Sequence, residues 1–325
     1  MPIFVQSALP RSKKGVKLPH FDNVTRMLVS SKVTTMVAKS YLETGPVRTC
    51  LHYFAVPKGE DDIRVVFDGT SCGLNDALWS PNFFLPTSRN ASEILSFDSW
   101  MADSDFAEFF HNFFADDEVR KHSGVEVSHL APYFPTSTSK EPQFKFEGLR
   151  WGRLFMGMKP SPYNAVRFYY WGEEFAMGNL RDESNPFGFD RVILNLPGMD
   201  TYDTTKPKIM KWNSARNHMS GGVVTFVDNV RMTGSSREHA HEVHRQFTSR
   251  MQYLGIQDAP RKFRPPSQNQ AGAWTETIFK ITKNVKSKTV SLEKWLKGRD
   301  IVSSLSLLLS EHPMERPLLN RKDLE

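Results

Sequence analysis

The chain has 325 residues, of which 39% are hydrophobic, 24% charged and 12% aromatic. This composition is ordinary for soluble globular proteins and excludes a disordered chain, which has few aromatic residues. No run approaches the roughly 18 apolar residues of a membrane helix, and the first ten residues lack a signal-peptide pattern. With two cysteines there is no disulfide framework or paired-cysteine metal site, so we expect an intracellular setting, cytoplasmic or nuclear.

The net charge of +6 conceals a marked asymmetry along the chain. Residues 250–299 contain eleven basic residues against three acidic ones, and residues 98–126 contain eight acidic residues against two basic ones. A basic segment suits a polyanion, and a concentrated acidic segment suits a divalent cation. On composition alone, two solvated surfaces of opposite charge explain the pattern equally well.

The N-terminal part of the chain is predicted to be rich in strands. Residues 1–30 are expected to form a loosely held lead-in, and a helix is predicted over 31–43. Residues 50–56 and 63–67 have the β-branched and aromatic composition of strands, with turn residues at 57–59 between them.

The middle of the chain alternates between strands and helices in the prediction. A third strand is expected over 100–106, where it passes into a helix. Residues 144–151 alternate apolar and polar side chains, as a hairpin does. Ser161 and Pro162 are predicted as the N-cap and first residue of a helix that runs to about Met177.

The segment that follows this helix is unusual in its length and composition. Residues 178–222 are rich in proline, asparagine and aspartate and are predicted to be a long loop-like insertion. Residues 223–227 then read as a short buried strand, and Asp228 and Asn229 lie where a hairpin would turn.

A further helix is predicted from the capping box of Ser235 and Glu238 to a stop at Gly255. Three histidines near its start lack the cysteine or partnered carboxylate of a zinc site, so they are expected on a solvated face. The order of the elements indicates an α+β fold whose lobes interleave along the sequence. The apolar residues of this helix are Ala240, Val243, Phe247, Met251 and Leu254, and the histidines are His239, His241 and His244.

Carboxylates occur at the ends of two predicted strands that are far apart in the sequence. Asp103 and Asp105 lie at a strand-to-helix transition, and Asp228 lies at a hairpin tip. Such groups can meet across a small sheet and hold two divalent metals roughly 3.5–4 Å apart, as nucleotidyl transfer requires. Neither site is specific by itself, because an aspartate at a turn is most often only a turn former.

The order of these motifs resembles that of reverse transcriptases. Residues 105–110, Asp-Phe-Ala-Glu-Phe-Phe, resemble motif A, in which an aspartate is followed five residues later by an aromatic residue. Residues 157–162, Gly-Met-Lys-Pro-Ser-Pro, resemble motif B. Residues 226–229, Phe-Val-Asp-Asn, resemble motif C, whose usual form is aromatic-x-Asp-Asp.

Further blocks flank these three motifs in the order of the family, and together they span roughly residues 45–300. The sequences of these blocks look most like those of reverse transcriptases of eukaryotic genomic retroelements, apart from the insertion at 178–222. The flanking blocks are 56–58, 63–68 and 74–75, which look like the fingers; 254–255 with 261–262, which look like motif D; 273–279, which look like motif E; and 290–294, which look like the first residues of the thumb.

The resemblance implies an α+β right-hand polymerase fold, with an antiparallel palm sheet backed by helices and an interleaved fingers subdomain. It implies template-directed DNA synthesis from deoxynucleoside triphosphates on a primed RNA or DNA template, with two Mg²⁺ or Mn²⁺ ions, and a place in a longer polyprotein. The implied segments are fingers at 31–98, palm with motif A at 99–118, a fingers/palm hairpin region at 119–155, palm with motifs B to E at 156–280, and a partial thumb at 281–325.

The resemblance assigns the metal-binding and proton-transfer roles to motifs A, C and D. Asp105 and Asp228 would hold both metal ions. Asp103 shares a strand face with Asp105 and is the alternative ligand. Lys262 would lie near the leaving pyrophosphate as a proton donor, and a plain phosphate-binding role is equally open.

The nucleotide would be bound by residues of the fingers and motifs A and B. Lys58 and Arg64 would neutralise the incoming triphosphate, unless they belong only to a solvated hairpin. Gly157, next to Met156, would allow the backbone to approach the nucleotide closely. Phe110 would lie beneath the sugar and exclude a 2′-hydroxyl, with core packing as the alternative. The residues expected to contact nucleic acid are Arg261, Arg264, Lys280 and Lys283.

The chain departs from the family at Asn229, which replaces the second aspartate of motif C. An asparagine offers a carbonyl oxygen to a cation but carries no negative charge. Three hypotheses follow: a working RNA-directed DNA polymerase, an inactive retroelement relic that binds nucleic acid, and an RNA-copying polymerase on the same palm. The aromatic Phe110 disfavours the third, because ribonucleotide selection requires room at that place.

Overall fold

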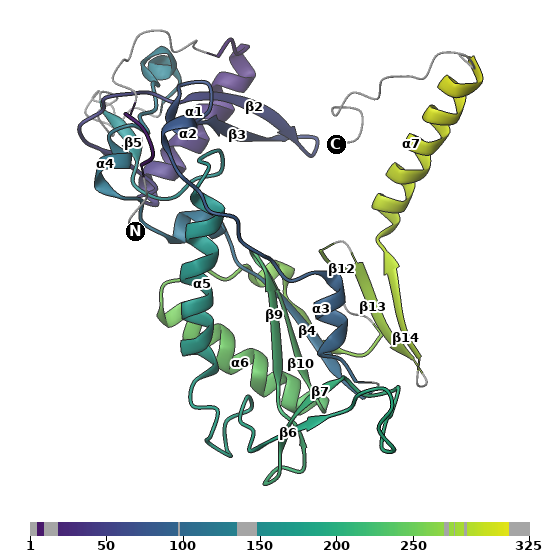
Figure 1. Ribbon diagram of the computed structural model, residues 1–325. Coiled ribbons are helices and arrows are strands. Elements are labelled where there is room, and N and C mark those ends of the chain that lie inside the picture. The colour runs from purple at the N-terminus through teal and green to yellow at the C-terminus, as the bar shows by residue number, and fades with distance from the viewer. Residues whose placement is uncertain are drawn as a thin grey trace. The chain divides into compact units, whose positions relative to one another are not determined.

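A computed structural model of the protein describes residues 5–9, 19–96, 98–134, 148–269, 273–275, 277–282 and 285–311 (Figure 1). The chain forms two compact units, each assembled from three separate stretches of sequence. The first unit comprises residues 1–85, 106–178 and 246–259, and the second comprises 86–105, 179–245 and 260–325. The antiparallel sheets and helices make this a mixed α+β structure.

The first unit is built around two small antiparallel pairings, β2 with β3 and β1 with β5. The β2–β3 hairpin confirms the two strands predicted there, and Gly59 has a φ of 71° in its turn. The elements are α1 (Asn23–Ala38), β1 (Leu42–Thr44), β2 (His52–Lys58), β3 (Asp62–Asp68), α2 (Leu74–Ala77), the 3₁₀ helix η1 (Phe109–Asn112), α4 (Asp117–Arg120), the 3₁₀ helix η2 (Ser128–Tyr133), β5 (Leu149–Trp151) and α5 (Ser161–Met177).

Two helix predictions in this unit need correction. The helix expected over 31–43 begins earlier, because Asp22 caps it by accepting a hydrogen bond from the Thr25 amide, and it ends at Ala38. Residues 42–44 are instead strand β1. The bounds of α5 agree with the prediction, but its N-cap is Pro160 rather than Ser161, which is buried in the first turn.

The second unit is centred on a four-stranded antiparallel sheet in the order β11–β4–β10–β9, which we call the palm sheet. Helix α6 begins in this unit and ends in the first. The elements are α3 (Ser88–Glu93), β4 (Trp100–Asp105), β6 (Arg191–Leu194), β7 (Ile209–Asn213), β8 (His218–Met219), β9 (Gly222–Phe226), β10 (Asn229–Gly234), α6 (Arg237–Tyr253), the 3₁₀ helix η3 (Pro260–Lys262), β11 (Arg264–Ser267), β12 (Ala273–Trp274), β13 (Thr277–Thr282), β14 (Val285–Val290) and α7 (Leu292–Glu311).

One face of the palm sheet is covered by the first turns of α6. Val230 and Met232 on β10 are completely buried, as is Val243 on the helix. Ser104 on β4 lies 3.0 Å from Nε2 of His244, which joins strand and helix by a hydrogen bond. Alternation along β4 therefore turns the neighbouring residues of Ser104 toward the opposite face.

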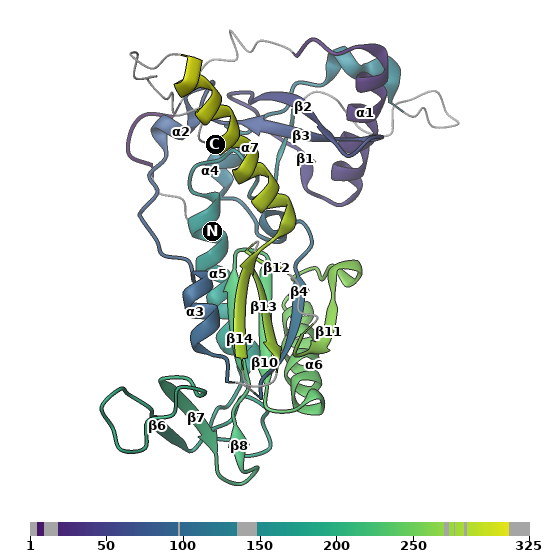
Figure 2. The same ribbon diagram turned by 90° about the vertical axis from the view of Figure 1, so that its right-hand side faces the viewer.

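The opposite face is covered by the three-stranded sheet β12–β13–β14 and by α3 (Figure 2). Val224 and Phe226 of β9 pack with Trp274 and Phe279 in one apolar cluster, in which Leu95 beyond α3 is also buried. Because both faces are packed, polar groups within the sheet are confined to its edges or must find partners.

The insertion at 178–222 is not loop-like, because it contains the three-stranded antiparallel sheet β6–β7–β8. Its turn residues dominate the composition, and the short apolar runs between them form the strands. Asn195 organises the loop between β6 and β7, since its side chain donates to the carbonyls of Asp203, Lys206 and Pro207.

The turn between β9 and β10 and the cap of α6 also differ in detail from the prediction. Val227 and Asp228 make the turn, and Asn229 is already the first residue of β10. The amide of His239 donates to Oγ of Ser236, which takes the capping role predicted for Ser235.

The predicted apolar face of α6 is confirmed for four of its five residues, and Leu254 is the exception. Ala240, Val243, Phe247 and Met251 are fully buried, but Leu254 is 38% exposed, just beyond the helix end. The prediction of a solvated histidine face was wrong for two of the three histidines, because among them only His241 is exposed. His239 is buried, and burial lowers the pKa of His244 to about 4, so both pack against other elements rather than facing solvent.

Several expectations lie outside the described residues. These are most of the lead-in before residue 19, residues 144–147 of the expected hairpin, Lys283, and residues 312–325 of the expected thumb. Among the helices that are described, none combines the length and the apolar character needed to cross a bilayer.

Candidate active site

The two carboxylates predicted to act together meet at one end of the palm sheet. Asp105 is the last residue of β4 and is paired directly with Asn229, the first residue of β10. Asp228 precedes Asn229 in the turn. Burial raises the pKa of the Asp228 carboxyl, and the negative charge of Asp105 raises it further. The two acids are therefore close enough to interact electrostatically.

A lysine joins these acids from η3, just before β11. Nζ of Lys262 donates a hydrogen bond to Oδ1 of Asp105 over 2.7 Å, and its positive charge acts against the rise in the pKa of Asp228. The lysine side chain is 56% exposed, whereas that of Asp105 is 10% exposed. The ammonium thus reaches the buried carboxylate from the solvent side.

The backbone of the turn has an unfavourable conformation. Val227 has a φ of 57°, in the left-handed region, which is rare for a β-branched residue and costs about 1–3 kcal/mol. The side chain of Asn229 donates to Oδ1 of Asp228 at 3.2 Å, and the indole of Trp274 donates to the Asn229 carbonyl at 3.2 Å. These bonds hold the turn that presents Asp228.

The alternative ligand Asp103 is engaged elsewhere. Arg231 donates two hydrogen bonds to it, Nε to Oδ1 at 2.7 Å and Nη2 to Oδ2 at 3.0 Å. The arginine side chain is completely buried, and its guanidinium lies 5.0 Å from the centre of the Phe279 ring. This bidentate pair leaves Asp105 as the better placed acid for a metal.

Neither Arg231 nor Trp274 was predicted from the sequence as part of this site. The signal for Arg231 was its spacing, since it follows Asn229 by two residues as Asp103 precedes Asp105 by two. On adjacent antiparallel strands this spacing pairs Arg231 with Asp103 whenever Asn229 pairs with Asp105. No comparable local pattern indicated the hydrogen bond from Trp274.

The oxygen donors at this end of the sheet suit a hard divalent cation. Two carboxylates and one amide oxygen match the preference of Mg²⁺ and Mn²⁺ for oxygen ligands. Within the described part of the chain, no group of three or more histidine, cysteine or acidic side chains is close enough to hold a metal by itself. The residues therefore fit a cation whose remaining ligands are water and substrate phosphates, as is usual for Mg²⁺.

The predicted nucleotide-binding residues belong to the first unit. Lys58 and Arg64 lie on the β2–β3 hairpin with exposed side chains, and Nζ of Lys58 is 3.8 Å from Oδ2 of Asp62. Met156 is exposed next to Gly157. Gly157 has a φ of 105°, and an added Cβ would lie 1.7 Å from the Phe67 carbonyl oxygen, so only glycine fits there.

Phe110 lies in η1, also in the first unit. Its side chain is half-buried, and its ring makes an edge contact with Phe109 at a centroid distance of 5.7 Å. This contact accounts for part of the ring surface, and the sugar-sensing role stays a prediction.

The predicted nucleic-acid contacts belong to the second unit. Arg261 in η3 and Arg264, the first residue of β11, have exposed side chains, and Arg264 is paired with Asp103 of β4. Lys280 is exposed on β13. This places exposed positive charge on both β11 and β13, and the contacts themselves stay predictions.

No known family model matches the chain, and no curated protein matches it. A solved structure of a foamy viral protease-reverse transcriptase in complex with double-stranded DNA does match, with a TM-score of 0.56 over 90% of this chain at 10% identity. The fold is reverse-transcriptase-like. At this identity the likeness shows the fold alone, and the chain spans 40% of the length of the viral protein.

Proposed function

We propose that the chain is a reverse-transcriptase-like nucleotidyltransferase that extends a primer along an RNA or DNA template with deoxynucleoside triphosphates. The observation that carries the proposal is the convergence of Asp105 and Asp228, 123 positions apart in the sequence, at one end of an antiparallel sheet. The likeness of the fold to a reverse transcriptase supports the same function.

In this proposal Asp105 and Asp228 hold two Mg²⁺ or Mn²⁺ ions. When bound, such ions neutralise phosphate charge and favour in-line attack by a primer hydroxyl. Lys262, which donates to Asp105, would stabilise or protonate the leaving pyrophosphate. Asn229 supplies a neutral oxygen at the place of a second carboxylate, and the strained Val227 fixes the direction of Asp228.

The remaining predicted residues take the roles expected from the family resemblance. Lys58 and Arg64 bind the triphosphate, and Met156 and Gly157 line the nucleotide site, with Phe110 under the sugar. The nucleic-acid backbone is bound by Arg261, Arg264, Lys280 and Lys283.

A second candidate function is nucleic-acid binding without catalysis. Asn229 and Lys262 favour it, because the first removes a negative charge from the site and the second already neutralises Asp105. A Coulomb interaction at about 4 Å with an effective dielectric near 20 amounts to about 4 kcal/mol before desolvation, so one lost charge is a substantial change.

Primer extension on RNA and DNA templates, with Mg²⁺ and with Mn²⁺, separates the two functions. Polymerase function predicts template-dependent extension that Asp105→Asn and Asp228→Asn each abolish, while both variants bind primer–template like the parent chain. Binding without extension in either metal, at any nucleotide concentration, would establish the second function. Extension that survives both substitutions would contradict the assigned site.

A further inference from the structure

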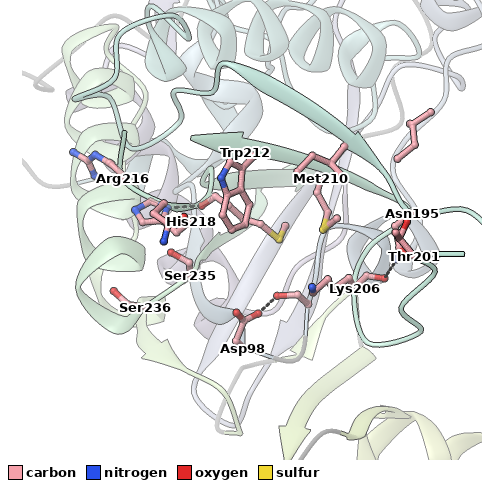
Figure 3. A pocket seen from close by; sticks show the side chains of 15 residues that line it. Asp98, Asn195, Thr201, Lys206, Met210, Trp212, Arg216, His218, Ser235 and Ser236 are labelled. Atoms are coloured by element: carbon pink, nitrogen blue, oxygen red, sulfur yellow. Dashed lines mark hydrogen bonds between the residues drawn. The ribbon is translucent and has the colours of Figure 1, made fainter. Parts of the chain in front are cut away.

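A groove in the first unit and a cavity in the second differ in the side chains that line them. The cavity, of about 710 Å³ beside the β6–β7–β8 sheet, has a mixed lining that includes Asp98, Lys206 and Arg216 (Figure 3). Charges of both signs there indicate no particular occupant. The groove, of about 320 Å³ between α5 and the end of α6, is lined mainly by aromatic and aliphatic side chains. An apolar hollow at the surface is typical of a docking site.

The exposed residues of α5 all fall on one stripe of the helix. In a helix of 3.6 residues per turn, their spacing keeps them within about 120° of one another around the axis. The other residues of the helix are buried or half-buried. Helices normally present polar residues to solvent, so a stripe with three exposed rings indicates a surface that another element covers. The stripe consists of Arg167, Phe168, Trp171, Glu174 and Phe175.

Rings from two neighbouring segments of the first unit extend this stripe. Tyr253, the last residue of α6, stacks on Phe175 with ring centroids 6.2 Å apart, and Phe114 lines the groove together with Phe168 and Trp171. Tyr253 is 82% exposed, Trp171 68% and Phe114 55%. At roughly 200 Å² per aromatic side chain, the exposed parts of the five rings amount to about 600 Å². One partner contributes about 800 Å² to a stable protein interface, so these rings alone supply most of that area.

The two charged residues of the stripe have opposite signs and lie on the same side of it. Arg167 and Glu174 are seven residues apart, which is about 10.5 Å along the helix, too far for them to pair with each other. Among the described residues neither has an ion-pair partner. Because their charges cancel, the stripe offers little to a polyanion such as nucleic acid. Its partner must instead supply a carboxylate and a cation with the same spacing.

A second copy of the same stripe meets this requirement. When two α5 helices run antiparallel about a two-fold axis, Arg167 of each copy lies opposite Glu174 of the other. Phe168 and Phe175 are also seven residues apart, and along the other edge of the stripe each lies beside its counterpart in the second copy in the same way. The midpoints of both pairs fall next to Trp171, so the two Trp171 rings meet near the axis. The stripe is therefore complementary to itself in charge and in aromatic surface.

We propose that this stripe is the contact surface of a symmetric dimer of the chain, formed by two antiparallel α5 helices. The rings supply the buried apolar area, and two symmetry-related pairs of Arg167 with Glu174 set the direction and the register of the helices. Such a contact uses the same surface on both copies and therefore closes at two. The proposal does not depend on polymerase activity, because none of the residues assigned to catalysis or to nucleotide binding belongs to the stripe.

Sedimentation equilibrium of the full 325-residue chain tests for the dimer. We expect a mass that rises with concentration from the 37.2 kDa of one chain and levels off at twice this value. Trp171→Ala should weaken dimerisation roughly hundredfold, as is usual for a tryptophan at the centre of an interface. The matched control is Phe84→Ala, which removes a 95% exposed ring outside the stripe and should leave the dissociation constant unchanged. Circular dichroism verifies that both variants keep the fold.

Charge reversal tests the antiparallel register. Arg167→Glu and Glu174→Arg each place like charges opposite one another at both symmetry-related positions, so each should weaken dimerisation roughly tenfold or more. The double variant with both changes should recover the affinity of the parent chain. An equimolar mixture of the two single variants should also associate, because each copy then supplies the charge that the other requires. Only a contact between two copies of this chain predicts both recoveries.

Four outcomes would overturn the proposal. A parent chain that stays monomeric at about 100 µM would leave the stripe to another segment of this chain or to a different protein. A dimer that Trp171→Ala does not weaken would use another surface. A mass that keeps rising beyond two copies would indicate non-specific association of an apolar surface rather than a closed contact. Failure of the double variant and of the mixture to associate would exclude the antiparallel arrangement of α5.

Discussion

Arg231 and Asp103 form a buried bidentate ion pair. On the same two strands, and two residues away, Asn229 is paired with Asp105. Because side chains alternate along a strand, all four of these side chains lie on the same face of the palm sheet. The ion pair therefore fixes the register of the two strands that carry the candidate metal ligands, because a slip by one residue would turn the two side chains of the slipped strand to the other face.

Removal of one partner of this pair should be strongly destabilising. We expect Arg231→Met to lower the free energy of unfolding by about 3–5 kcal/mol, because it leaves Asp103 charged and largely buried. Denaturant titration followed by circular dichroism measures this. The double variant Arg231→Met with Asp103→Leu should recover part of the loss. Lys206→Met, which breaks an exposed pair, should cost less than about 1 kcal/mol.

Asp228 should reduce stability at neutral pH, since its raised pKa means that ionisation is less favourable in the folded chain. For an acid whose folded pKa is raised, stability is greatest below the unfolded value of 3.8 and falls as the pH rises through the folded value. Asp228→Asn should therefore be more stable than the parent chain near pH 7 and lose that advantage below about pH 4. Equal melting temperatures of the two chains at both pH values would contradict the buried, ionised carboxylate.

Asn229→Asp should increase primer extension by restoring a negative charge opposite Asp105. The same variant should favour Mg²⁺ over Mn²⁺ more than the parent chain does, because a fuller set of oxygen ligands suits the stricter ion. Steady-state extension rates in each metal give the comparison. If neither the parent chain nor the variant extends a primer, the defect lies outside this end of the sheet.

Lys262→Gln should free Asp105 for the cation and at the same time impair turnover. Binding of Mn²⁺ without nucleotide, measured by electron paramagnetic resonance, should tighten, while the extension rate falls. A proton-donor role further predicts that the alkaline limb of the pH–rate profile disappears in the variant. A profile of unchanged shape at a lower rate would assign the lysine to phosphate binding instead.

Phe110→Val should admit ribonucleotides with little effect on deoxynucleotide use. A ring under the sugar leaves a 2′-hydroxyl without room and without a hydrogen-bond partner, which costs about 1–3 kcal/mol and corresponds to roughly tenfold selection or more. Incorporation kinetics with paired nucleotides check the ratio. Unchanged discrimination would mean that the ring only packs against Phe109.

The sequence was most informative where a short segment carries its own pattern. The short segments 100–106 and 223–227 predicted β4 and β9, the apolar spacing predicted α6, and the motif order led to the reverse-transcriptase-like fold. Contacts that depend on strand register could not be predicted in this way. The pairings of Arg231 with Asp103 and of Lys262 with Asp105 join residues 128 and 157 positions apart.

Composition was misleading where turns outnumber strands. In the insertion, proline, asparagine and aspartate mark the turns of a small sheet, but the apolar runs between them are too short to identify as strands without their partners. The caps of α5 and α6 were displaced by one residue because Ser235 and Ser236 are chemically equivalent cap candidates and a proline preceded Ser161.

The bond from the Trp274 indole to the Asn229 carbonyl indicates how long a fragment must be to keep the turn at Asp228 in place. A polypeptide that stopped after β11 would keep Asp105, Asp228 and Lys262 but would lose the ring that steadies the turn and the apolar cover over Val224 and Phe226. Recombinant truncations should therefore retain residues through Ile281, and shorter fragments are expected to aggregate through the uncovered face of the palm sheet.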